Sequence, residues 1–135
     1  MVATMQREAA EDFAQEWVEA FNSHDLDRIM SHYASDITLT SPFAAARGHA
    51  DGMVSGRDAL RDYLAAGLAA NPQLRFDLKA VYAGVRSVVV HYLANFGPGR
   101  SSLSAEMMEL DGGLVTRVVA HYERLPGPAT PEEAP

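Results

Sequence analysis

The chain has 135 residues, a net charge of −7, no cysteine, and a hydrophobic content of 47%. This length suits one domain with a sizeable core, and the acidic balance argues against nucleic acid or anionic lipid as a partner. Without cysteine, disulfides and thiol chemistry are excluded. The N-terminus is acidic, unlike a signal peptide, and no apolar run reaches the roughly 20 residues that span a bilayer. We therefore expect a cytoplasmic protein without membrane contact.

Three helices are predicted in the first half of the chain. The clearest covers residues 5–22, where apolar side chains recur at the spacing of one helical face. A short second helix follows the N-cap residue Asp25, and its apolar stripe ends at Tyr33. Residues 55–58 have the pattern of a capping box that opens a third helix, which ends before Pro72.

One short strand is predicted between these helices, at residues 37–40, because β-branched residues dominate there. Ser41 and Pro42 end it, since proline cannot donate to a β-ladder. The stretch 43–54 has no clear period, and we predict a long loop that either acts as a lid or carries ordinary solvated residues. Its candidate lid residues are Arg47, His49 and Asp51.

After residue 73 the period changes from 3.6 to 2, which predicts a meander of four strands. In the first of them, Phe76 and Tyr82 are expected on one face. Short turns indicate antiparallel neighbours, so the predicted fold is α+β: a cone-shaped barrel with three N-terminal helices packed on a strongly curved, mostly antiparallel sheet. The domain is expected to cover residues 1–125, and the proline-rich tail 126–135 to be disordered. The four strands are predicted at 74–82, 87–96, 101–110 and 114–122.

Glu106 is the most informative residue, because it shares an otherwise apolar strand face with Met108 and Leu110. A carboxylate in such a place is costly unless it is paired, hydrogen-bonded or protonated. Two interpretations stay open. Glu106 is either an acid with a raised pKa that hydrogen-bonds a ligand carbonyl or moves a proton, or a structural carboxylate paired with Arg100, Arg117 or a backbone amide.

Three stretches of the chain carry a resemblance to the nuclear transport factor 2-like superfamily, and more narrowly to its SnoaL-like branch. They are WVEAFNSHDLDRIMSHYASDITLTSP at 17–42, GRDALRDYL at 56–64 and MELDGGLVTRV at 108–118. The resemblance implies a cystatin-like fold. The superfamily includes isomerases, polyketide cyclases, dehydratases and binding domains without chemistry, so the function has to be argued from the site.

Ketosteroid isomerase resembles the chain distantly, and its three functional positions can be compared with it. The tyrosine position is Trp17, the base position is Ser41 and the acid position is Glu106. Only the acid role is retained, because serine is no base near neutral pH and an indole N–H cannot ionise as a phenol does. Glu106 and Ser41 are therefore the candidate catalytic residues, with Ser41 as a polar contact.

The cone is expected to hold a small apolar carbonyl compound, without a metal or another cofactor, because no metal-ligand spacing occurs. Trp17 and Tyr33 can alternatively be ordinary core residues. The predicted ligand-binding residues are Trp17, Tyr33, Phe43, Phe76, Val90, Tyr92, Met108 and Tyr122.

His91 and His121 have the opposite strand parity from Tyr92 and Tyr122, which places them on the outer sheet face. That face is apolar enough to predict a homodimer interface. A slip of one residue would instead turn both histidines inward as catalytic candidates. Two functions follow as hypotheses: an isomerase-, cyclase- or dehydratase-type proton-transfer enzyme, or a non-catalytic dimeric domain that binds a small molecule or a protein.

Overall fold

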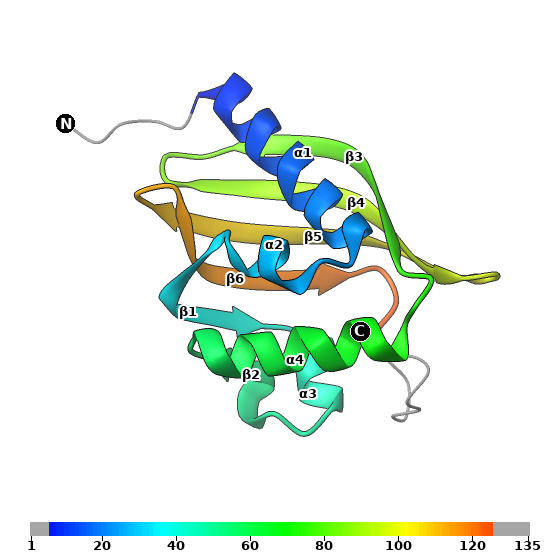
Figure 1. The fold of residues 1–135 in the computed structure, drawn as a ribbon. Helices are drawn as coiled ribbons and strands as arrows, with labels where there is room; N and C mark the ends of the chain where they lie inside the picture. Colours follow the sequence, from blue (N-terminus) through cyan, green and yellow to red (C-terminus); the bar gives the residue numbers. More distant parts are fainter. Residues whose placement is uncertain (1–5, 126–135) are drawn as a thin grey trace.

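The computed structural model describes residues 6–125 (Figure 1). The predicted disordered tail, residues 126–135, lies outside the described residues. Helices and strands follow one another along the chain much as their periodicities predict. The elements are α1 (Arg7–Ser23), α2 (Leu26–Met30), β1 (Tyr33–Thr40), α3 (Pro42–Ala46), the short 3-10 helix η1 (Ala50–Gly52), β2 (Met53–Ser55), α4 (Arg57–Ala70), β3 (Arg75–Ala83), β4 (Ser87–Gly97), β5 (Arg100–Asp111) and β6 (Leu114–Tyr122).

The strands form one six-stranded sheet in the order β2-β1-β6-β5-β4-β3. Every neighbouring pair is antiparallel except β1 and β6, which are parallel because the chain crosses over from one end of the sheet to the other. Helix α1 packs on β3 and α4 packs on β1, so both helices cover the sheet (Figure 1). The predicted α+β cone is confirmed, but the sheet is open at β2 and β3 and does not close into a barrel.

The start of β1 corrects the predicted second helix. Asp25 is the N-cap as expected, because its carboxylate accepts the Arg28 N–H at 3.2 Å. The helix ends at Met30, however, and Tyr33 is the first residue of β1, opposite Val115 of β6. Strand pairing thus overrides the helical spacing that Tyr33 shares with Ile29.

The sequence predicts a long loop over residues 43–54, and this prediction is wrong. The stretch contains α3, η1 and β2. Helix α3 begins where the Ser41 hydroxyl accepts the Phe43 N–H at 3.1 Å and Pro42 takes the first helical position. The predicted capping box at 55–58 is also wrong, because Ser55 pairs with Thr38 in the sheet and Gly56 is the N-cap without a side-chain bond.

Strand parity decides which side chains enter the cone, and the pairing confirms the prediction for β4, β5 and β6. Tyr92 and Glu106 are buried on the inner face, whereas His91 and His121 stand on the outer face, both opposite Ala105. Strand β3 differs, because a register shift between Leu78 and Ala80 reverses the alternation. Tyr82 is therefore 59% exposed rather than on the Phe76 face.

Among residues 6–125, none of the helices combines the length and the apolar character of a membrane-spanning segment. The core instead fills the space between the sheet and helices α1, α2 and α4. A bulge-free run of inward side chains on β4, from Val88 to Ala94, forms its floor.

Candidate functional site

Glu106 lies on β5 between Val90 of β4 and Ala120 of β6, with only 6% of the residue exposed. The Tyr92 hydroxyl donates a hydrogen bond to its Oε2. The predicted arginine pairing does not occur, because Arg117 contacts Glu109 at 3.4 Å on the outer face and Arg100 lies over the Phe96 ring. A phenol, rather than a cation, thus partners this buried carboxyl group.

Burial raises the pKa of Glu106 from 4.5 to about 7, because the charged form loses its hydration, while the Tyr92 hydrogen bond opposes the shift. A carboxyl group with a pKa near neutrality can accept and return a proton with little driving force lost in either direction. This is the property that an acid–base residue requires at physiological pH.

A cavity of about 40 Å³ opens beside Glu106. That volume holds on the order of three water molecules, so only a small group fits without movement of the walls. The walls are mainly apolar, and the polar groups gather around the acid. The lining residues are Phe21, Tyr33, Leu39, Ser41, Tyr63, Leu64, Gly67, Leu68, Leu74, Phe76, Glu106, Ala120 and Tyr122.

The sequence-derived residues divide into two groups in the structure. Five of them line the cavity: Tyr33, Ser41, Phe76, Glu106 and Tyr122. The other five are buried in the core and do not border it: Trp17, Phe43, Val90, Tyr92 and Met108. Sequence reasoning missed the α4 side of the wall, although Tyr63, Leu64 and Leu68 are prominent in the apolar stripe of that helix.

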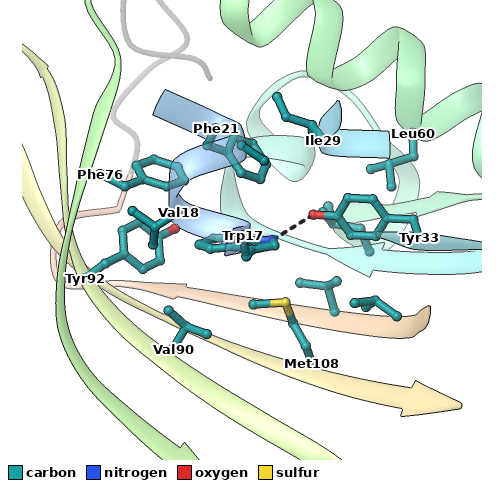
Figure 2. Close-up of a cluster of buried hydrophobic side chains, with 14 of the residues drawn as sticks. Trp17, Val18, Phe21, Ile29, Tyr33, Leu60, Phe76, Val90, Tyr92 and Met108 are labelled. Carbon is teal, nitrogen blue, oxygen red and sulfur yellow. Dashed lines mark hydrogen bonds between the residues drawn. The ribbon is translucent and has the colours of Figure 1, made fainter. Parts of the chain in front are cut away.

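Trp17 acts through Tyr33 rather than on the cavity (Figure 2). Its indole N–H donates to the Tyr33 hydroxyl at 3.1 Å, and its ring stacks on Phe76 with centroids 5.5 Å apart. Since the Tyr33 oxygen accepts this bond, its own O–H proton can donate to a group in the cavity. Burial raises the pKa of Tyr33, so this phenol stays protonated.

Three more hydroxyls surround the acid. Ser41, Tyr63 and Tyr122 line the same cavity as Glu106. Burial raises the pKa of Tyr63 to about 12, and it raises that of Tyr122 as well. All of these groups are therefore neutral hydrogen-bond donors near pH 7, which suits a ligand oxygen that gains negative charge.

The predicted lid residues lie outside the cavity. Arg47 stands over the Tyr63 ring at 5.2 Å, and the His49 ring meets the edge of the same phenol at a centroid distance of 5.6 Å. Asp51 is exposed. Segment 42–52 thus packs against Tyr63 of α4 and positions it. Tyr63, unlike Arg47 and His49, lines the cavity.

Gly52 fixes the backbone of Ser41. Its carbonyl accepts the Ser41 N–H at 2.9 Å, its φ is +67°, and a Cβ atom there would lie 2.9 Å from the Ser41 carbonyl oxygen. We expect Gly52→Ala to lower the free energy of unfolding by about 2–3 kcal/mol, from the left-handed backbone and the collision together. Urea unfolding measures this.

Gly48→Ala is the matched control, because Gly48 has a φ of +92° but open space around its Cβ position. It should cost only about 1 kcal/mol, the backbone contribution alone. Equal losses in the two variants would contradict the claim that Gly52 packs directly against Ser41.

Within residues 6–125, no three His, Cys, Asp or Glu side chains gather in a way that could hold a metal ion.

A family model for the SnoaL-like domain matches residues 14–124. The chain belongs to the SnoaL-like family. A SnoaL-like protein of unknown function from Burkholderia thailandensis is 32% identical, with a TM-score of 0.82 over 90% of this chain and 99% of that one. No curated protein sequence matches significantly. Recognition of the family from the sequence is thereby confirmed.

Two further structures share the fold of this SnoaL-like chain at lower identity. An uncharacterised cystatin-fold protein from Novosphingobium aromaticivorans is 22% identical, with a TM-score of 0.67 over 82% of this chain and 95% of that one. A Kribbella flavida protein provisionally assigned as a ketosteroid isomerase is 16% identical, with a TM-score of 0.68 over 91% and 84%. At these identities the likeness establishes the cystatin-like fold alone.

Proposed function

We propose that this SnoaL-like protein is a proton-transfer enzyme for a small apolar carbonyl compound, of the isomerase, cyclase or dehydratase type. The observation that carries the proposal is Glu106: a buried carboxyl group on a cavity wall, with a pKa raised to about 7 and the Tyr92 phenol as its hydrogen-bond partner. Such perturbed acids concentrate at functional sites.

The proposed mechanism uses one carboxylate in both directions. Glu106 in its ionised form removes a proton from the carbon next to the carbonyl, and the resulting enolate oxygen accepts hydrogen bonds from neutral phenols. Tyr33 and Tyr122 are the proposed donors, since both line the cavity. Protonated Glu106 then returns the proton to the same or another atom, so no other base is required.

The cavity chemistry also defines the substrate class. Phe21, Leu39, Leu74 and Phe76 offer no hydrogen bonds, so a ligand with several polar groups would leave some of them unsatisfied. One carbonyl oxygen, directed at the phenols, matches the polar groups present. Because the cavity is about 40 Å³, the ligand either is very small or displaces the half-buried leucines of α4, Leu64 and Leu68.

Deuterium exchange tests this function directly. Small enolisable ketones are incubated with the protein in D₂O, and loss of the signal from the protons next to the carbonyl is followed by NMR. We expect exchange of at least one apolar ketone well above the rate in buffer, and above that with an equal concentration of an unrelated acidic protein. If none of a broad set of ketones exchanged faster with the protein than in buffer, the proposal would be contradicted.

The second candidate is a non-catalytic binding domain, and Ser41 is the observation in its favour. At the position where ketosteroid isomerase has its base, this chain has a hydroxyl that caps α3. NMR titration can detect saturable binding of ketones through chemical-shift changes of Tyr33 and Tyr122. Such binding without any exchange activity would support this function instead.

We also propose that the protein is a homodimer through the outer sheet face. Val89, Leu93, Met107 and Val119 stand there, partly exposed, on the side opposite the inner residues of the cone. Met107→Glu should shift a dimer to monomer at micromolar concentration in light scattering, because a charge would be buried unpaired. Ala69→Glu, at an exposed position of α4, should leave the dimer unchanged. A wild-type monomer would contradict the proposal.

A further inference from the structure

The carboxyl group of Glu106 has two oxygens, and the structure engages one of them. Its Oε2 accepts the hydrogen bond of the Tyr92 hydroxyl. Glu106 lines the cavity, whereas Tyr92 is fully buried and does not border it. The phenol therefore holds the acid from the core side, and this leaves the second oxygen, Oε1, for a molecule in the cavity.

The register of the sheet brings these two side chains together. Across β4 and β5, Val90 is the residue opposite Glu106, and Tyr92 lies two residues farther along the same face. Such a diagonal pair is within reach of an aromatic ring and a long side chain. Both strands are inside the sheet, with a paired strand on each side. The separation of the phenol and the acid is thus set by the β-ladder, which holds side chains more precisely than a loop does.

The Tyr92 ring is itself held in place by the aromatic core behind the cavity (Figure 2). Its centroid lies 4.4 Å from that of Phe76 and 5.4 Å from that of Trp17, which it meets edge-on. Burial and the nearby charge of Glu106 raise the pKa of Tyr92, so the phenol keeps its proton. A ring packed in this way keeps its hydroxyl directed at the acid. Tyr92 is therefore a fixed donor over the whole pH range in which Glu106 titrates.

A fixed donor acts differently on the two protonation states of Glu106. The ionised carboxylate accepts the bond with a negative charge, and such charge-assisted bonds are roughly twice as strong as neutral ones. The protonated acid accepts it on a neutral oxygen, so the bond stabilises the ionised form more. Burial raises the pKa of Glu106, and this hydrogen bond opposes the shift. The phenol thus keeps a useful fraction of the acid ionised at neutral pH, as a base requires.

We propose that Tyr92 is the positioning residue of this site: it anchors Oε2 of Glu106, so that Oε1 alone exchanges a proton with the ligand. The chemistry of this inference rests on the proposed function. As the ligand's C–H bond breaks, an O–H bond forms on Oε1, and the electron pair of the broken bond moves onto the ligand oxygen. The return step reverses these changes. Tyr92 keeps its own proton throughout and acts only through Glu106.

A carbon-13 NMR titration of the glutamate carboxyl groups tests the positioning role without any substrate. The Glu106 resonance is the one missing from E106Q, and its pH midpoint is expected near 7 in the wild type. Tyr92→Phe keeps the ring and removes the hydroxyl. Because a hydrogen bond to a charged group contributes more than a neutral one, we expect this midpoint to rise by roughly one to two pH units. An unchanged or lower midpoint would overturn the proposal.

Ser104→Ala is the matched control, because Ser104 is a buried hydroxyl on β5 whose bond goes to the Ser102 carbonyl. It should leave the Glu106 midpoint unchanged. A measurement on the wild type covers the case in which Tyr92→Phe does not fold. The ring carbon that bears the Tyr92 hydroxyl should shift with the same pH midpoint as Glu106, and this shift should be absent from E106Q. A Tyr92 resonance that ignores the titration of Glu106 would contradict the positioning role.

The rate of ketone exchange adds a readout that a merely structural role of Tyr92 would not give. Tyr92→Phe should lower the rate at pH 7 by roughly five- to fiftyfold, because less Glu106 is ionised, and the rate should recover as the pH rises through the new midpoint. Ligand affinity should change little. An equal loss of rate at every pH would refute the positioning role. The NMR midpoint is measured without a ketone, so an absence of exchange activity and an absence of the midpoint shift are separate failures.

Discussion

Glu106→Gln is expected to slow proton exchange on a small apolar ketone by about 10²–10⁴-fold, the range that a positioned acid–base group contributes. Glutamine keeps the shape of the protonated acid and can still accept the Tyr92 hydrogen bond. It cannot, however, take up or release a proton. Ligand affinity should therefore change little while turnover falls, which separates chemistry from binding.

The pH dependence of the exchange rate adds a second readout of the same substitution. Because the proposed base is the ionised carboxylate, the wild-type rate should rise with pH and level off above the pKa of about 7. This inflection should be missing from the residual rate of E106Q. NMR exchange rates at several pH values, with ligand affinity measured by titration, check both expectations.

Glu109→Gln is the matched control for this experiment. Glu109 lies on the same strand, three residues farther on, but it stands on the outer face and contacts Arg117. Its loss should leave the exchange rate unchanged. If E109Q and E106Q had equal effects, or if E106Q kept full activity, Glu106 would not be the proton-transfer group.

The pH dependence of stability should differ between wild type and E106Q by about 3 kcal/mol. Burial raises the pKa of Glu106 from 4.5 in an ordinary setting to about 7 in the fold, so between these values the folded state binds more protons than the unfolded state. The contribution of Glu106 is therefore fully present below pH 4.5 and is lost as the pH rises through 7.

Urea unfolding at several pH values between 4 and 9 measures this difference. E106Q and wild type should have similar free energies of unfolding at pH 4, and E106Q should be the more stable above pH 8. The other carboxylates titrate in both proteins and cancel in the comparison. Glu16, for example, has a pKa lowered to about 2 by its hydrogen bond to Arg28, and this pair is present in both.

Parallel stability curves for E106Q and wild type would show that Glu106 is not a neutral acid in the fold. The groups that surround it are phenols from several elements: Tyr33 of β1, Tyr63 of α4, Tyr92 of β4 and Tyr122 of β6. These phenols stay protonated over this range, so they add no titration of their own to the difference.

The meander illustrates why part of the site could be predicted from the sequence. Alternation with a period of 2 depends only on the pleat of a strand, so Glu106 could be placed on the inner face and His91 on the outer face before any partner was known. The register shift in β3 shows the limit of that reasoning. One extra residue at Leu78 to Ala80 turned Tyr82 outward, and local spacing carries no sign of it.

The sequence by itself determined the family, the α+β order of elements and the presence of an acid on an apolar face, because these depend on local periodicity and residue type. Only the tertiary structure decided that Trp17 supports Tyr33 from the core, that Tyr92 rather than an arginine partners Glu106, and that Tyr63 of α4 lines the cavity. These contacts join residues far apart in the chain, and the packing that sets their distances is a property of the whole fold.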